Sequence, residues 1–132
     1  MMITDPIGDF IVRLKNATAV RKATVAVPFS KLKLAVSLTL KKAGYLGEIK
    51  EEGSGVSKVL VVELLYGAEG NPRINGVKRI SKPGRRLYAK AREVFPVKYG
   101  KGLMVLSTPQ GIVTDREARQ NRLGGETLFK IW

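Results

Sequence analysis

The chain of 132 residues contains no cysteine and no histidine. Without cysteine it has no disulfide, no thiolate nucleophile and no cysteine-based zinc site. Without histidine it lacks the side chain that most often serves as a general base or as a metal ligand. The composition therefore predicts a protein that is not an enzyme and that uses neither a metal ion nor a cofactor.

Long apolar runs and a secretory leader are also missing. The longest apolar runs, such as Val59–Val62, are far shorter than the roughly 20 residues that a membrane-spanning helix needs. The segment Met1–Phe10 contains two acids, Asp5 and Asp9, and no basic residue, unlike the start of a signal peptide. We therefore expect a soluble protein of the cytoplasm.

Acidic residues are scarce relative to basic ones. The chain has 24 Lys and Arg against 11 Asp and Glu, which gives a net charge of +13 at pH 7. Residues 1–75 carry a net charge of +4 and residues 76–132 carry +9. A surplus of this size attracts polyanions, so nucleic acid is the favoured partner and an anionic membrane surface is the second candidate.

Two small lobes are expected. Hydrophobic residues make up 44% of the chain, which is enough for a core, and the loop-like segment Gly67–Pro72 separates a lobe of residues 1–72 from a lobe of residues 73–132. The first lobe follows an α-β-α-β-β pattern. Its expected elements are a helix that begins at Asp5 and Pro6, a strand at Thr24–Val27, a helix between Ser30 and Gly44 with Leu32, Ala35, Val36, Leu40 and Ala43 inward, and a hairpin of Tyr45–Glu52 with Ser57–Tyr66.

The second lobe is expected to be mostly β, so that the chain as a whole has an α+β fold. Its expected elements are strands at Asn75–Ile80, Arg86–Ala89, Leu103–Ser107 and Glu126–Trp132, with a helical turn at Ala91–Val94 ended by Pro96. A short helix begins at a capping box formed by Thr114 and Glu117. We expect Gly124 and Gly125 to end this helix with positive φ angles.

A basic cluster with an aromatic residue marks the second lobe. Strand alternation places Arg86 and Tyr88 on one face, where a guanidinium and a ring can contact a phosphate and a base together. A solvated surface is the alternative, but the uniform sign of the region favours a polyanion site. The cluster consists of Lys78, Arg79, Lys82, Arg85 and Arg86 around Pro83-Gly84.

Two further segments offer polar groups. The turn Ser107-Thr-Pro-Gln-Gly111 can present hydroxyls and backbone N–H groups to unpaired RNA, although a turn selected for its geometry alone is the simpler interpretation. In the helix that follows, Arg116 and Arg119 are candidates for phosphate contacts. Glu126 can accept a hydrogen bond from a base amino group, or it is an ordinary surface carboxylate.

Catalysis and membrane binding are both disfavoured. The acids Asp115, Glu117 and Glu126 suggest metal-assisted phosphodiester chemistry, but helix capping explains the first two. The chain contains no glycine-rich phosphate-binding motif. The lysine-bearing helix of residues 30–43 has no aromatic residue to insert into a bilayer.

Taken in order, the motifs resemble the bacterial-type ribosomal protein S8 family of the small subunit. The matching segments are Thr4–Ile7, Val27-Pro28, Ser30–Lys33, Gly44-Tyr45, Lys78–Arg86 with Tyr88, Leu106–Thr108, Thr114-Asp115 and Gly124–Glu126. The resemblance implies a primary rRNA-binding protein that binds the central domain of 16S rRNA and helps to assemble the platform. It implies S5 and S12 as protein neighbours and, as an alternative role, repression of a ribosomal-protein mRNA.

The resemblance also implies which residues contact RNA. The family's turn and Gly-Gly-Glu segments face the RNA, with the basic cluster beside them and a contribution from the first lobe. The candidate RNA-binding residues are Ser30, Lys31, Arg79, Lys82, Arg85, Arg86, Tyr88, Ser107, Thr108, Pro109, Gly111, Arg116, Arg119, Gly124, Gly125 and Glu126. Two positions depart from the family pattern: Pro109 replaces a serine, which removes a hydroxyl and an N–H donor, and Lys101 replaces an apolar residue.

Overall fold

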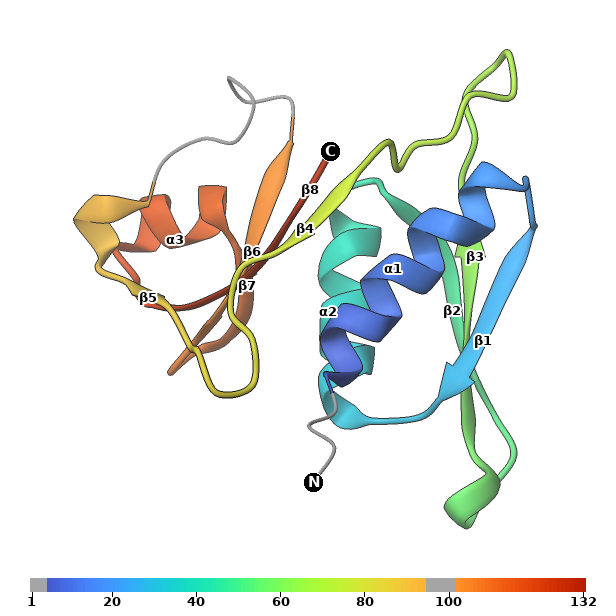
Figure 1. Cartoon of the computed structure of the whole chain (residues 1–132), viewed down its shortest axis with the longest axis horizontal. Coiled ribbons are helices and arrows are strands. Elements are labelled where there is room, and N and C mark those ends of the chain that lie inside the picture. The colour runs from blue at the N-terminus through green and yellow to red at the C-terminus, as the bar shows by residue number, and fades with distance from the viewer. Residues whose placement is uncertain (1–4, 95–101) are drawn as a thin grey trace. The chain divides into compact units, whose positions relative to one another are not determined.

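The computed structural model describes residues 5–94 and 102–132. These residues form three α-helices and eight strands in two antiparallel sheets, so the expected α+β class is confirmed (Figure 1). The chain divides into two compact units. The N-terminal unit is Phe10–Asn75, and the C-terminal unit is Gly76–Trp132 together with Met1–Asp9.

The N-terminal unit is a three-stranded sheet with helices on one face (Figure 1). Its strands pair in the order β1-β3-β2, and alternate residues of β1 are buried, as a sheet with one covered face requires. The elements are α1 (Pro6–Ala19), which begins in the C-terminal unit, β1 (Thr24–Pro28), α2 (Lys31–Lys42), β2 (Leu46–Glu52), the 3-10 turn η1 (Gly55–Ser57) and β3 (Val59–Leu64).

Both helices of this unit begin at the predicted caps. The Gly8 N–H donates to Asp5 Oδ1 over 3.2 Å, and the Lys33 N–H donates to Ser30 Oγ over 3.1 Å. The predicted apolar side of α2 is partly wrong, because Leu32 is 43% exposed and Ser37 is buried instead. The Ser37 hydroxyl donates to the Lys33 carbonyl within the helix, and this bond allows a polar residue to occupy the buried stripe.

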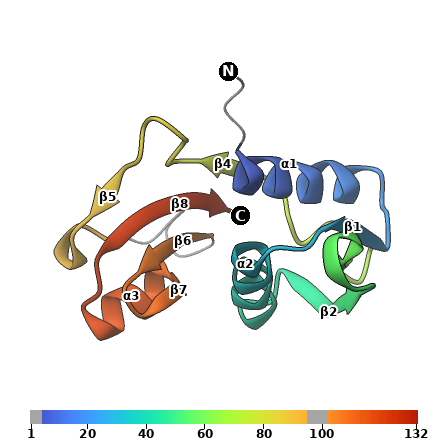
Figure 2. The same ribbon diagram turned by 90° about the horizontal axis from the view of Figure 1, so that it is seen from below.

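The C-terminal unit is built around its last strand. Strand β8 pairs with β6 along one edge and with β4 and β5 along the other, and β7 extends the sheet beyond β6 (Figure 2). Buried Met104 and Leu106 pack with Val94 and with Ala118 of the helix α3. The elements are β4 (Val77–Arg79), β5 (Tyr88–Ala89), the 3-10 turn η2 (Ala91–Glu93), β6 (Leu103–Thr108), β7 (Gly111–Thr114), α3 (Asp115–Asn121) and β8 (Gly125–Ile131).

Two expectations for this unit are wrong. The strand predicted at residues 86–89 is only Tyr88–Ala89, so Arg86 lies in the preceding loop. The helix α3 does not end through Gly124 and Gly125, since the left-handed residue is Arg122 with φ 54° and neither glycine has a positive φ.

The two glycines are required for a different reason, which is close backbone packing. A Cβ on Gly124 would lie 2.6 Å from the Ala89 carbonyl oxygen, and one on Gly125 would overlap the Ser107 carbonyl oxygen. They therefore let β5 and β6 approach β8 from both sides. Pro96 and Lys101, the other positions singled out in this region, lie outside the described residues.

Candidate nucleic-acid interface

Sheet pairing in the C-terminal unit brings three separate candidate segments together. Tyr88 of β5 lies opposite Glu126 of β8, and Glu126 lies opposite Ser107 of β6. Directly opposite residues of antiparallel strands project from the same face, about 5 Å apart. Tyr88, Glu126 and Ser107 thus form one line across the sheet, which we call the cross-strand row.

The cross-strand row combines different chemical groups. Tyr88 is 70% exposed, which is unusual for an aromatic side chain and leaves its ring free for stacking. Ser107 adds a half-buried hydroxyl, and Glu126 adds a carboxylate. A stacking ring beside a hydroxyl and an acceptor is suited to an unpaired base.

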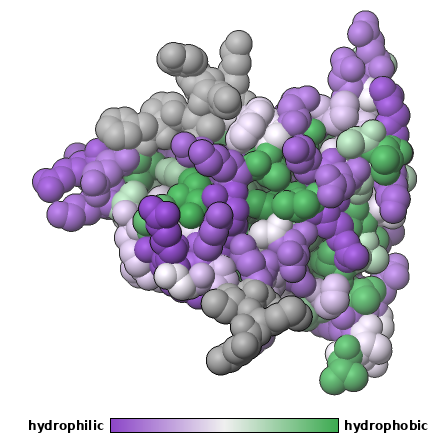
Figure 3. Space-filling model, viewed as in Figure 1, coloured by the Kyte–Doolittle hydropathy of each residue, from purple (hydrophilic) through white to green (hydrophobic). Residues whose placement is uncertain are grey.

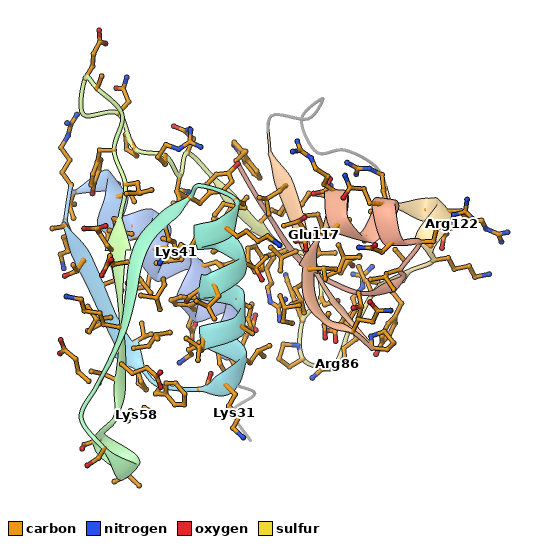
Figure 4. All side chains as sticks on the ribbon, turned by 180° about the vertical axis from the view of Figure 1, so that it is seen from behind. Lys31, Lys41, Lys58, Arg86, Glu117 and Arg122 are labelled. Carbon is orange, nitrogen blue, oxygen red and sulfur yellow. The ribbon has the colours of Figure 1, made fainter. Side chains whose placement is uncertain are left out.

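Arg86 connects the basic cluster to this row. Its Nη1 lies 3.1 Å from Glu126 Oε2, and the Arg86 side chain is 57% exposed while that of Glu126 is 14% exposed (Figure 4). The ion pair holds the carboxylate in one orientation and leaves most of the guanidinium in solvent. Arg86 therefore joins the row through Glu126, and not through the strand alternation predicted from the sequence.

The turn between β6 and β7 is held by Thr108. Its Oγ1 donates to the Gly111 carbonyl over 2.8 Å and accepts from the Gln110 N–H over 3.2 Å. Gly111 has a φ of 114°, which favours glycine, and Pro109 is exposed at the tip. The Thr108 hydroxyl is thus used to shape the turn that lies next to the cross-strand row.

A tight turn presents two cations of the basic cluster. The Arg85 N–H donates to the Lys82 carbonyl over 2.9 Å, and the Lys82 N–H donates back to the Arg85 carbonyl over 3.0 Å. Pro83 followed by Gly84 with a φ of 84° fits a type II turn. Both Lys82 and Arg85 are exposed at this turn.

Sequence reasoning missed the residue that closes this loop. Ser81 is fully buried, and its Oγ donates to the Leu87 carbonyl and accepts from the Leu87 N–H at 3.1 and 2.9 Å. These bonds satisfy a buried hydroxyl and fix the base of the loop that carries Lys82, Arg85 and Arg86. Serine beside a Pro-Gly turn is common, so the sequence held no specific signal for this role.

Arg79 differs from the other cations because its donors are used inside the protein. Its Nε and Nη2 lie 3.1–3.2 Å from the Asp5 carboxylate, and its Nη1 donates to the Leu128 carbonyl. Burial alone would raise the pKa of Asp5, but hydrogen bonds from Arg79 and Gly8 and the charges of Arg79 and Lys82 lower it below the usual value of 3.8. Arg79 is thus the member of the basic cluster whose contacts stabilise the fold.

The helix α3 contributes one arginine in an ion pair and one exposed arginine. Arg119 Nη1 lies 2.7 Å from Asp115 Oδ2, and buried Asp115 also accepts from the Met104 N–H. Arg116 is exposed.

Glu117 completes the predicted capping box with Thr114. Asp115, Glu117 and Glu126 serve separate contacts, and residues 5–94 and 102–132 contain no group of three or more acidic side chains that could hold a metal ion.

The candidates of the N-terminal unit lie at the start of α2. Ser30 is the N-cap, so its oxygen is used by the Lys33 N–H, and Lys31 is exposed at the first helical position (Figure 4). Within the described ranges no helix is long and apolar enough to cross a membrane. Lys31 thus places an exposed cation at the N-terminal end of α2.

Comparison with known proteins decides the family. The model of the ribosomal protein S8 family matches residues 5–132. The chain belongs to the ribosomal protein S8 family. It is similar, over the full length of both chains, to small ribosomal subunit protein uS8 of Clostridium beijerinckii (48% identity), Clostridium botulinum (47%) and Rubrobacter xylanophilus (42%).

Membership of the S8 family confirms the resemblance read from the motifs. These relatives are named as proteins of the small ribosomal subunit. In this S8-family chain, three of the segments that carried the resemblance meet in one sheet, through Tyr88, Ser107-Thr108 and Gly125-Glu126. The segments that identify the family are therefore the ones that form the cross-strand row.

Proposed function

We propose that this S8-family chain is a structural component of the small ribosomal subunit in the cytoplasm, where it binds the central domain of 16S rRNA and helps to assemble the platform. The cross-strand row carries the proposal, because it places a free ring, a hydroxyl and an oriented carboxylate beside exposed cations. The names of the relatives supply the subunit. S5 and S12 are the expected protein neighbours.

The basic cluster and the row have different tasks in this proposal. Lys82, Arg85 and the exposed part of Arg86 neutralise phosphates and release counterions, which provides affinity that depends on salt. Tyr88, Glu126 and the backbone around Ser107 contact unpaired bases and 2′-hydroxyls, which provides selectivity. A regular duplex satisfies only the first task, since its base edges and rings are not accessible to these groups.

The N-terminal unit adds a secondary phosphate contact in this proposal. Lys31 begins α2 as an exposed cation, while the Ser30 oxygen already accepts a hydrogen bond from the helix. We expect Lys31 to contribute to affinity and Ser30 to contribute through the shape of the helix start. Arg116, which is exposed on α3, is assigned the same role as Lys31.

The test compares two RNAs of equal length and charge. The dissociation constant of the chain is measured for a 16S central-domain fragment and for a perfect duplex, at several salt concentrations. We expect both affinities to fall with salt, while the fragment stays bound more tightly by a roughly constant factor of at least about 10³. Equal affinity for the two RNAs at every salt concentration would contradict the proposal.

A further inference from the structure

A second surface of the C-terminal unit has the features of a ligand site. A pocket of about 620 Å³ lies between β4, the loop before β5, and the middle of β6 and β8. Thr127 and Met104 are among its walls. Thr127 follows Glu126 in β8, and successive residues of a strand project from opposite faces. This reverse-face pocket is therefore separate from the cross-strand row.

Positive charge dominates the lining of the reverse-face pocket. Of its charged side chains, Arg79 is paired with Asp5, and Glu93 contributes one negative charge while it accepts a hydrogen bond from the Lys90 N–H. The remaining charged lining residues are Lys78, Lys82, Arg85 and Lys130, and none of them forms an ion pair within the described parts of the chain. A ligand with several negative charges would complement them.

Two of these lysines oppose each other directly. Lys78 of β4 is the cross-strand partner of Lys130 of β8, and both line the pocket. Like charges in this position repel each other and destabilise the sheet. An anion bound between the two side chains would remove that repulsion, so the pair is an independent indication of an anionic ligand.

The floor of the pocket indicates the rest of the ligand. Leu87, Ala89, Ile80 and Met104 are the apolar residues of its lining, and we call them the floor. Leu87 is 40% exposed, so part of this floor faces solvent. Figure 3 shows apolar surface flanked by hydrophilic side chains in the region of β4 and β5. A flat heterocycle would bury apolar surface against this floor, whereas an inorganic anion would not.

We propose that the reverse-face pocket binds one nucleotide, with its phosphates among Lys78, Lys82, Arg85 and Lys130 and its base on the floor that includes Leu87. A pocket of about 620 Å³ is within the usual size range of small-molecule sites. The nucleotide is either a free nucleoside triphosphate or one residue of an RNA strand. This site lies on the other face of the sheet from the cross-strand row, and it shares Lys82 and Arg85 with the basic cluster.

The first experiment tests the charged rim with ATP as the probe. ATP is titrated into the full chain and into the double variant Lys78→Ala/Lys130→Ala, and binding is followed by calorimetry and backbone amide shifts. We expect the variant to bind ATP at least about tenfold more weakly, since two charge-assisted contacts are lost. We also expect the variant alone to melt at a higher temperature than the wild type at low salt.

A matched control removes the same charge elsewhere. The variant Lys15→Ala/Lys41→Ala changes two exposed lysines of α1 and α2 and leaves the pocket intact. It should bind ATP within about twofold of the wild type, because long-range charge effects are screened at physiological salt. If this control weakens ATP binding as much as the pocket variant does, the proposed site is wrong.

The second experiment tests the apolar floor with the variant Leu87→Ala and tripolyphosphate as a second probe. The Leu87 backbone makes the bonds to Ser81, so the truncation leaves the loop closed. We expect this variant to lose affinity for ATP by about fivefold and to retain its affinity for tripolyphosphate. Wild-type affinities that are equal for the two probes, and unchanged in the variant, would overturn the proposal.

A competition experiment distinguishes the two sources of the nucleotide. If the oligonucleotide rA6 displaces ATP, the natural ligand is a residue of an RNA strand, and if it does not, a free nucleotide is favoured. Absence of binding by both ATP and rA6 to the pocket would overturn the proposal. The variant Glu126→Gln should bind ATP normally, so a failure of the rRNA proposal is distinguished from a failure of this one.

Discussion

Arg86 and Glu126 form an ion pair that joins the loop before β5 to the start of β8, with Nη1 and Oε2 3.1 Å apart. Arg86 is mostly exposed and Glu126 is mostly shielded. In the proposed function, the Arg86 guanidinium contacts phosphates (the electrostatic side of the pair) and the Glu126 carboxylate accepts a hydrogen bond from a base (its acceptor side). We therefore expect replacement of Arg86 and replacement of Glu126 to affect RNA binding in different ways.

Replacement of Glu126 tests the acceptor side. The variant Glu126→Gln should weaken binding to the central-domain fragment by about 1–3 kcal/mol, because a base amino group loses its charged acceptor, and should leave binding to a perfect duplex unchanged. Filter binding with both RNAs measures the difference. The control Glu52→Gln, at an exposed position of β2, should change neither affinity. Equal losses on both RNAs would contradict a selective role for Glu126.

Replacement of Arg85 tests the electrostatic side. The variant Arg85→Ala should weaken binding to all RNAs and lower the slope of log K against log salt by about one, as expected for a single lost phosphate contact. Arg86→Ala should produce the same slope change and an additional loss on the central-domain fragment, since Glu126 loses its orientation. The variant Lys50→Ala is the matched control on the N-terminal unit. If Arg85→Ala reduces selectivity, the assignment of separate tasks is wrong.

The Asp5–Arg79 pair should make stability depend on acid pH. The pKa of folded Asp5 lies below its usual value, so the contribution of this carboxylate to stability is complete above the unfolded value near 3.8 and is lost as the pH falls through the folded value. The variant Asp5→Asn keeps a good helix cap and removes the ion pair, and should lower the free energy of unfolding by about 1–3 kcal/mol at neutral pH.

Urea denaturation from pH 7 down to pH 2 measures this effect. The difference between wild type and Asp5→Asn should shrink toward the acid end of the series. The variant Asp9→Asn, an exposed acid in the same first turn of α1, should show a much smaller difference at every pH. A difference between Asp5→Asn and the wild type that does not vary with pH would be inconsistent with the lowered pKa.

Gly125→Ala tests the close packing of β8 against β6. The added Cβ would overlap the Ser107 carbonyl oxygen, so the strands must separate, and the free energy of unfolding should fall by at least about 1–3 kcal/mol. Thermal melting measures the loss. The control Gly67→Ala, where the nearest atom to the added Cβ lies at 3.6 Å and φ is not positive, should change stability little. Similar melting of the two variants would refute the packing role.

Thr108 should act through the shape of its turn. Thr108→Val removes both hydrogen bonds of the hydroxyl and should destabilise the β6–β7 hairpin by about 1–2 kcal/mol, while Thr108→Ser keeps both bonds. The same order should be seen in affinity for the central-domain fragment. Hydrogen exchange at Gly111 and Ile112 reports the hairpin directly. A valine variant with wild-type exchange and reduced RNA affinity would indicate direct contact instead.

Local features of the fold were predictable because they depend on neighbouring residues. The caps at Asp5, Ser30 and Thr114 each need one side chain and one N–H three positions later, so the sequence alone identifies them. The Pro83-Gly84 turn was predictable for the same reason. The short β7 and the left-handed residue Arg122 were not, since neither carries a strong intrinsic preference.

The sequence alone predicts which residues belong to the candidate site, but it does not predict how they are arranged in space. Which residue faces Glu126 depends on the register of β5, β6 and β8, and register is a property of distant segments. The same holds for the opposition of Lys78 and Lys130 and for the pairing of Arg79 with Asp5. For this reason Arg79 looked like another member of the basic cluster.

Asp5 and Arg79 are 74 positions apart, yet both belong to the C-terminal unit. Because the chain is synthesised from its N-terminus, Asp5 is made long before its partner Arg79, and β8, which pairs with three other strands of the sheet, is made later still. The Phe10–Asn75 stretch can gain its structure meanwhile as an insertion within the other unit. The C-terminal unit therefore completes its sheet only after β8 has been made, whereas all residues of the Phe10–Asn75 unit are present earlier.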